Sequence, residues 1–430
     1  MATSAQSPIR SDTSQAVADT GGPVSKADRI DSLDFIRGIA VMGILAANII
    51  AFGQPFSAYI YPGAFLVPTG DPDGWMWIAQ FVLVDGKMRG LFTLLFGAGM
   101  YLFMERAWAR GATRKLQLWR LFLLACFGLV HFLFIWIGDI LFMYGVIGFI
   151  AAACMRWTAK AQLWTGLVGY LFGALLYTVL AFPYFVVDTP LGEMDGMEEV
   201  RAEMVAQVEQ ELDGDRASTE LKQAGDYAGF VEHRISEEFQ YLPFNILIFV
   251  FETLPLMLIG MALYRHGFFS GALDRSKMVL WGWIGIVAGG AASLGIGLIA
   301  KEADFSYWAG NAAFLSFSPI PRIAMVLGLA SLLVAYSPRW AGWLAERVRA
   351  AGRAAFTNYL GTSILMLFVF HGWALGLFGE LNRPQLYGVM LATWIIMLAW
   401  SKPWLDRFRY GPLEWLWRCL TYRQLFPIKR

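Results

Sequence analysis

The stretch LFLLACFGLVHFLFIWIGDILFMYGVIGFIAAAC, residues 121–154, decides the class of this chain. It contains one histidine, His131, one acidic residue, Asp139, and neither Lys nor Arg. A membrane-spanning helix needs about 20 mostly apolar residues. The stretch is long enough for the greater part of two such helices, with a break near Gly138. We therefore expect a polytopic membrane protein.

The rest of the chain has the same character. Its 430 residues are 57% hydrophobic and 16% charged, whereas an ordinary soluble domain is about 25% charged. The apolar segment 75–84 is too short to span and predicts an amphipathic or re-entrant piece. The predicted fold class is all-α, a bundle of about ten transmembrane helices with a helical outer loop. The expected spans are residues 36–53, 87–105, 116–137, 139–157, 161–187, 242–264, 278–300, 312–337, 354–379 and 385–402.

Charge and cysteine content exclude several classes of protein. The net charge of +1 argues against nucleic-acid binding, because phosphate neutralisation needs a concentrated basic face. The three cysteines lack the spacing of a metal or redox motif, so we expect no metal site and no disulfide scaffold. The predicted loops hold 25 Lys and Arg residues on one side of the membrane and six on the other. The positive-inside rule then places both termini in the cytoplasm.

The chain divides into five predicted regions. A disordered cytoplasmic tail (1–34) is followed by an N-terminal helical half (35–187), an acidic outer insertion (188–241), a C-terminal helical half (242–402) and a basic, aromatic cytoplasmic tail (403–430). The insertion carries 15 acidic and 4 basic residues, and its apolar residues at helical spacing predict one or two amphipathic helices. It is either a solvated insertion or a lid over an outward-facing cavity.

Ionisable residues inside the spans are the informative ones, because each costs on the order of 2.5 to 3.5 kcal/mol near the bilayer centre. The spans contain His131, His371, Glu252 and Arg322. At about 1.5 Å per residue, the two histidines share a depth in the outer half of the membrane. We expect them to converge there with the polar residues near other outer helix ends, which are Asn48, Asp85, Lys87, Arg89 and Asp139.

Asp139 follows His131 by eight residues, about two helical turns, so both would face the same side of a continuous helix. Alternatively, a break at Gly138 would bring the carboxylate back toward the cavity. A carboxylate that orients an imidazole makes it a better general base. The alternative is structural. In that case His131 is a buried hydrogen-bonding group between helices, and Asp139 caps the next helix.

Other charged residues also leave two alternatives open. Lys87 and Arg89, at a helix start, either hold an anionic group or extend to the membrane interface. Glu252 either belongs to a functional site or forms a structural hydrogen bond while protonated. Basic residues at the cytoplasmic helix ends either anchor the protein to lipid headgroups or grip the phosphates of a donor such as coenzyme A. Those assigned to the donor are Arg37, Arg114 and Arg120.

Five stretches resemble, in chain order, the successive blocks of the YeiB-like family of bacterial polytopic membrane proteins, a domain of unknown function. They are RIDSLDFIRGIAVMGILAANI, KMRGLFTLLFGAGMYLF, HFLFIWIGDILFMYGVIG, GRAAFTNYLGTSIL and FRYGPLEWLWRCLTY. The resemblance covers about residues 29–425 and implies a location in the bacterial inner membrane. His131, Gly138 and Asp139 match the third block, and Asn358 lies in the fourth.

The opening block is also similar to that of the heparan-alpha-glucosaminide N-acetyltransferase family and of bacterial membrane acyltransferases that decorate cell-surface glycans. Asp34, Arg37 and Gly38 match the shared motif, and Asn48 falls where those enzymes carry an Asn or His. This more distant resemblance implies a bundle of about ten or eleven helices. It also implies that an acyl group moves from cytoplasmic acyl-CoA to an acceptor reached from outside.

The chain departs from the acetyltransferase pattern in one respect. Residues 53–74, after the first span, contain no histidine, whereas the acetyltransferase relatives place a catalytic histidine there or on the first helix. His131 or His371 would have to take that role.

The favoured hypothesis is a membrane acyltransferase. His131, oriented by Asp139, or else His371, acts as the general base, and Asn48 with Lys87 or Arg89 stabilises the oxyanion. Acyl-CoA is the expected donor. The expected partners are membrane lipids and a small-molecule or glycan acceptor, and a homodimer is left open. The substrate-binding set comprises Lys87, Arg89, Glu252, Arg322 and Asn358.

The alternative is a proton-coupled transporter or lipid-handling permease. In that protein Glu252, His131 and Asp139 form a proton relay, and the acidic outer insertion gates access.

Overall fold

The computed structural model describes residues 31–430 except residue 69, and these residues form helices and no named β-strand. The predicted all-α class is confirmed. Short 3₁₀ and π turns join several of the helices. The helices are α1 (Asp31–Gly53), α2 (Asp71–Leu83), α3 (Lys87–Trp108), α4 (Arg114–Phe134), α5 (Leu141–Ala153), α6 (Ala159–Val179), α7 (Phe182–Val187), α8 (Glu198–Ala224), α9 (Tyr227–His233), α10 (Leu242–Arg265), α11 (Arg275–Glu302), α12 (Tyr307–Asn311), α13 (Pro319–Tyr336), α14 (Trp343–Arg353), α15 (Ala355–Phe370), α16 (Arg383–Arg407) and α17 (Pro412–Tyr422).

Seven helical segments of the described residues are long and apolar enough to cross a membrane. An eighth results if α14 and α15, which meet at 86°, form one broken span. The chain is therefore built as a multi-pass membrane protein, whereas the expected count of about ten spans is not confirmed. The expected span 139–157 is realised by α5, which has 13 residues, because the helix begins only at Leu141. The predicted tail over 1–34 lies, up to residue 30, outside the described residues.

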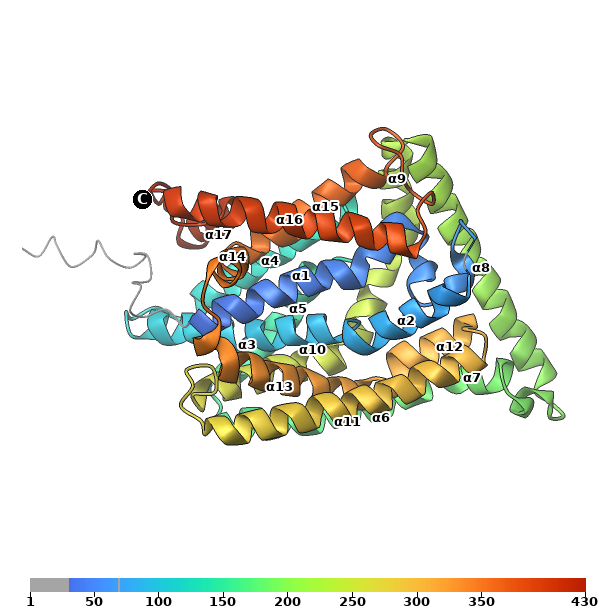
Figure 1. Cartoon of the computed structure of the whole chain (residues 1–430), viewed down its shortest axis with the longest axis horizontal. Helices are drawn as coiled ribbons and strands as arrows, with labels where there is room; N and C mark the ends of the chain where they lie inside the picture. The colour runs from blue at the N-terminus through green and yellow to red at the C-terminus, as the bar shows by residue number, and fades with distance from the viewer. Residues whose placement is uncertain (1–30, 69) are drawn as a thin grey trace, which may run out of the picture.

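The bundle has two different ends. Figure 1 shows the long helices side by side, with α8 running across one end and with α14 and α17 at the other. We call these the α8 end and the α17 end. α8 and α9 come from the acidic stretch 188–241. Glu198 and Glu199 occupy the first turn of α8, where negative charge is favourable, and the left-handed Gly225 (φ 71°) ends the helix.

Glycines allow the close helix contacts that place the polar residues. A Cβ on Gly97 of α3 would lie 2.1 Å from the carbonyl oxygen of Met257, and one on Gly260 of α10 would lie 2.0 Å from that of Leu94. The backbones of α3 and α10 therefore touch, as small residues permit in membrane bundles. On α4, a Cβ on Gly128 would lie 2.1 Å from the backbone nitrogen of Phe142 of α5. The contact between α3 and α10 and the contact between α4 and α5 bring together helices that carry polar residues of the core.

Candidate functional site

The turn between α4 and α5 holds a buried histidine and a buried carboxylate together. His131 lies in the last turn of α4, and its carbonyl oxygen accepts the N–H groups of Ile135 and Trp136. The chain then reverses, and Asp139 precedes α5. The distance between His131 Nδ1 and Asp139 Oδ1 is 2.8 Å. Their relative exposures are 0% and 6%, so solvent does not compete for this hydrogen bond.

Asp139 performs both functions that its position allows. Its Oδ2 accepts the N–H of Phe142 at 2.7 Å, in the first turn of α5, while Oδ1 holds His131. The two alternatives left open by the sequence are therefore present at once, a helix cap through one oxygen and imidazole orientation through the other. This arrangement fixes the ring of His131.

The other nitrogen of His131, Nε2, is buried and has no hydrogen-bond partner among the described residues. The ring lies 5.3 Å from that of Tyr359 and 6.3 Å from that of Trp136, measured between centroids. A buried polar atom without a partner costs free energy. Nε2 is thus available to exchange a proton with a group that enters beside it.

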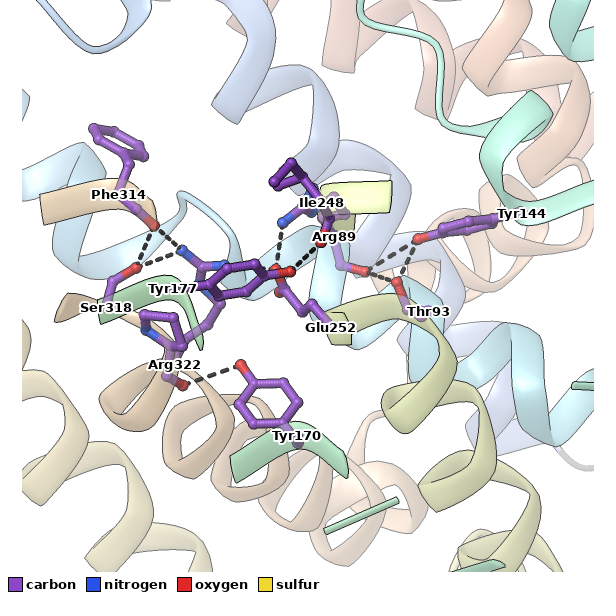
Figure 2. A network of polar contacts seen from close by, with 11 residues as sticks. Arg89, Thr93, Tyr144, Tyr170, Tyr177, Ile248, Glu252, Phe314, Ser318 and Arg322 are labelled. Carbon is purple, nitrogen blue, oxygen red and sulfur yellow. Dashed lines mark hydrogen bonds and ion pairs between the residues drawn. The ribbon is translucent and has the colours of Figure 1, made fainter. Parts of the chain in front are cut away.

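A second polar group joins α3, α10 and α13 (Figure 2). Glu252 Oε2 accepts Nη2 of Arg89 at 2.7 Å and Nη1 of Arg322 at 2.8 Å. Arg322 follows the two prolines at the start of α13, and its Nη2 also donates to the carbonyl oxygen of Phe314 and to the hydroxyl of Ser318. We call Glu252, Arg89 and Arg322 the charge cluster. One carboxylate is shared by two guanidinium groups, so the charge cluster carries an excess of positive charge.

Hydrogen bonds extend the charge cluster toward the histidine. The carbonyl oxygen of Arg89 accepts the hydroxyl of Thr93 at 2.8 Å and that of Tyr144 at 3.4 Å. Tyr144 belongs to α5 and packs in the same hydrophobic cluster as Tyr359, which contacts His131. Figure 2 shows Tyr144 at the edge of the charge cluster. No hydrogen bond or ion pair among the described residues joins the charge cluster directly to His131 or Asp139.

A third polar group surrounds the start of α3. Asp85 accepts hydrogen bonds from Tyr59 (3.1 Å) and Gln80 (3.2 Å). Burial raises the pKa of Asp85 to about 6. The ammonium of Lys87, which is 1% exposed, donates to the carbonyl oxygen of Phe81 at 2.5 Å. Lys87 therefore lies inside the protein and does not extend to the membrane interface.

Asn48 of α1 lies next to Ala47, whose carbonyl oxygen accepts the side chain of Gln80. Its own side chain is half-buried.

His371 lies in different surroundings from His131. It follows α15 at the α8 end, is 5% exposed, and packs against Phe230 with ring centroids 4.7 Å apart. A small pocket there includes His371, Lys222, Arg234 and Trp136 in its lining. His131 is not part of that lining, but its ring lies 6.3 Å from that of Trp136, which belongs to the lining. The structure therefore does not bring the two histidines into the lining of one pocket.

Comparison with known proteins relates nearly the whole chain to two relatives. The uncharacterized protein YeiB of Escherichia coli (strain K12) is 30% identical over 410 residues, which cover 93% of this chain and 98% of that protein. The chain belongs to the YeiB-like family. The uncharacterized protein YxaH of Bacillus subtilis (strain 168) is 28% identical over 95% of this chain and 98% of its own length. A family described as "Protein of unknown function (DUF418)" matches residues 263–424. No solved structure matches.

The basic residues assigned to a donor lie toward the α17 end of this YeiB-like chain. Arg120 lies between the rings of Phe103 and Trp417, at 4.3 and 4.2 Å from their centroids. Arg37 pairs with Asp34 at 3.2 Å and is a charged neighbour of Arg120. Arg114 starts α4, half-buried, and its Nε has no partner among the described residues. Arg37 and Arg120 are therefore brought together.

Asn358 has a structural role. Its amide nitrogen donates to the carbonyl oxygen of Ala351 at 3.0 Å and to the hydroxyl of Ser401 at 3.2 Å, and its oxygen accepts the indole N–H of Trp400 at 2.9 Å. It is 3% exposed and joins α14, α15 and α16. These bonds use most of its hydrogen-bonding capacity, so we withdraw it from the substrate-binding set.

The sequence alone did not identify several polar residues of the site. Gln80 and Tyr59 hold Asp85, while Lys222 and Arg234 line the pocket beside His371. Arg234 is spaced four residues from Glu238, a signal for a helical ion pair, and the two are bonded at 2.9 Å. Nothing in the spacing of the others points to these contacts, because each joins distant parts of the chain.

Proposed function

We propose that this YeiB-like protein is a membrane-embedded acyltransferase that moves an acyl group from acyl-CoA to an acceptor reached from the opposite side of the membrane. The proposal rests above all on the His131–Asp139 pair. One imidazole nitrogen is held by a carboxylate, and the other is buried and without a partner. This is the arrangement of a general base with its orienting group.

In the proposed reaction, His131 and Asp139 act together on the acceptor and the thioester. The acceptor hydroxyl or amine loses its proton to His131 Nε2 as its oxygen or nitrogen attacks the thioester carbonyl carbon. The resulting oxyanion is stabilised by hydrogen-bond donors, for which Asn48 and Lys87 are our candidates. The oxyanion then collapses, the carbon–sulfur bond breaks, and the CoA sulfur takes the proton from His131. Acylated acceptor and free CoA are the products.

The geometry of α4 supports the assignment of the donor. Arg120 and His131 lie eleven residues apart on this helix, which corresponds to about 16 Å and about three full turns, so they share a face. In our proposal Arg120 and Arg37 hold the donor phosphates, and the extended arm of CoA runs along α4 to the thioester. The excess of Lys and Arg at the α17 end supports the orientation in which this end faces the cytoplasm.

One observation favours the transporter alternative. A buried carboxyl group with a pKa of about 6, at Asp85, changes charge near neutral pH, as a proton-coupled protein requires. Glu252 fits the alternative less well, because a relay through it would have to break its ion pairs with Arg89 and Arg322. The acyltransferase and the transporter are distinguished by adding acyl-CoA without a proton gradient, because only the acyltransferase should then release CoA.

The deciding experiment measures CoA release from acetyl-CoA by purified full-length protein in nanodiscs, with and without a membrane extract as the source of acceptor. We expect acceptor-dependent release that falls by roughly 10²- to 10⁴-fold in His131→Gln. His266→Gln, at an exposed histidine, is the matched control and should leave the rate unchanged.

Asp139→Asn is the second variant, because it keeps a hydrogen-bonding group at the position of Asp139. We expect it to bind acetyl-CoA normally but to turn over slowly. Absence of acetyl-CoA binding to folded wild-type protein, or equal rates in His131→Gln and wild type, would refute the proposal.

A further inference from the structure

The pocket beside His371 has the features of a binding site for an anionic group. Its walls come from the end of α1, the turn between α4 and α5, the end of α15 and the segment α8 to α10. The free space is about 30 Å³, which exceeds the roughly 10–15 Å³ that one water molecule needs. The pocket therefore accommodates the tip of a ligand and not a whole one.

Lys222 provides the positive charge of this pocket. Its ammonium lies 5.7 Å from the ring centroid of Phe230 and 4.6 Å from that of Phe378. No hydrogen bond or ion pair of this ammonium to another described residue is found. Burial and the nearby Arg234 lower the pKa of Lys222 to about 8, against the opposite effect of Glu238 and Asp215. A half-buried ammonium without a hydrogen bond to a described residue keeps its three N–H donors for a ligand.

Arg234 adds a second cation that is fixed in place. It is 1% exposed, donates to Glu238 at 2.9 Å, and donates to the carbonyl oxygen of Phe132 at 3.0 Å. Glu238 pairs with Arg234, and Glu238 and Asp215 both act on Lys222 from outside the pocket. The described lining contains these two cations and no Asp or Glu, which favours an anion at the pocket wall.

His371 supplies a further polar atom. Its Nδ1 is buried and has no partner within the described part of the chain, and the residue is 5% exposed and lines the pocket. An imidazole N–H can donate to an anion without carrying charge. The built pocket thus combines one free ammonium, one fixed guanidinium and one unpaired imidazole nitrogen.

We propose that this pocket binds a phosphate or carboxylate group of the acceptor, with Lys222 as its main ligand and His371 as a second donor. The assignment of this anionic group to an acceptor rests on the proposed acyl transfer, whereas the binding of an anion in this pocket does not. Trp136 lines the pocket, and its ring lies 6.3 Å from that of His131. In the proposed reaction, the hydroxyl or amine of an acceptor anchored here reaches past the indole of Trp136 to Nε2 of His131.

The test is a binding titration of full-length protein in an uncharged maltoside detergent, without acyl-CoA. Glycerol 1-phosphate and glucuronate are the anionic probes, and glycerol and glucose are their neutral counterparts. We expect saturable binding of the anionic probes only, measured by calorimetry and by a shift in thermal unfolding. Lys222→Gln should weaken it by about 10- to 100-fold, and Lys222→Arg should restore most of the affinity.

Lys301→Gln is the matched control, because it removes a lysine that is exposed, that lies in the last turn of α11, and that is outside the pocket. It should change the affinity by less than about twofold. His371→Gln gives a second measure, with an expected loss of about tenfold. Absence of binding, equal affinity for the neutral probes, or equal effects of Lys222→Gln and Lys301→Gln would overturn the proposal.

Nanodiscs distinguish the two sources of such a group. A Lys222-dependent stabilisation by phosphatidylglycerol over phosphatidylcholine identifies a lipid headgroup, whereas binding of the soluble probes alone identifies a water-borne acceptor, and both support the anion site. Failure of this site leaves acceptor-dependent CoA release intact. Failure of the proposed acyl transfer leaves Lys222-dependent anion binding intact.

Discussion

Neutralising Glu252 tests whether the charge cluster holds the bundle together. Glu252→Gln keeps the size of the side chain but leaves Arg89 and Arg322 without a counter-charge. The side chains of Arg322 and Glu252 are 6% and 5% exposed, and breaking a buried pair of this kind costs roughly 3–5 kcal/mol. The side chain of Arg89 is 24% exposed, so solvent compensates for most of its loss. We therefore expect a loss of roughly 3–5 kcal/mol in the free energy of unfolding.

The assay is unfolding in mixed micelles with increasing sodium dodecyl sulfate, followed by tryptophan fluorescence. Arg322→Met should cost a similar amount and Arg89→Met clearly less, because the two arginines differ in exposure. Glu380→Gln, at an exposed carboxylate, is the control and should stay within about 0.5 kcal/mol of wild type. A loss below about 1 kcal/mol in Glu252→Gln, or equal losses in the two arginine variants, would refute this reasoning.

Three further predictions concern ligands. Since Lys222 has a pKa of about 8, affinity for glucuronate, which is fully ionised above about pH 5, should be level from there to about pH 7 and fall as the pH rises through 8, whereas Lys222→Arg should stay level in the same titration. Arg120→Gln should raise the KM for acetyl-CoA by about tenfold or more at unchanged kcat, and should not affect acetyl-pantetheine, which lacks the phosphates. Trp136→Ala should increase acceptor-independent hydrolysis of acetyl-CoA severalfold, because it admits water to His131; unchanged hydrolysis would show that Trp136 is not the barrier.

The sequence predicted the features that depend on local spacing. The apolar composition led to an all-α membrane bundle, and the eight-residue interval between His131 and Asp139 led to their pairing. Of the two routes to this pairing that the sequence left open, a continuous helix and a break near Gly138, the structure has the break. α4 ends at Phe134, and the following turn brings Asp139 back to the ring.

Features made by distant segments could not be predicted in the same way. Depth along an idealised helix places His131 and His371 at one level, but it does not say which residues surround each ring. Only His371 lines the pocket. The rotation of each helix and the turn after Phe370 decide this, and these depend on packing. Lys222 and Arg234 line the pocket only because α8 and the segment after α9 fold back over the end of the bundle. No local sequence pattern predicts this arrangement.

Hydrogen-bond accounting separates architectural residues from chemical ones among the buried polar groups. Asn358 uses its amide nitrogen and its oxygen on neighbouring helices, so its bonds are explained by the fold alone. His131 and His371 each leave one buried ring nitrogen without a partner in the part of the chain that the structure describes. Each such atom costs roughly 1–3 kcal/mol, a sizeable fraction of a net stability of about 5–15 kcal/mol. Neither cost is offset within the described fold, whereas bound ligands would offset both, and Trp136 adjoins both histidine sites, because it lines the pocket of His371 and its ring lies 6.3 Å from that of His131.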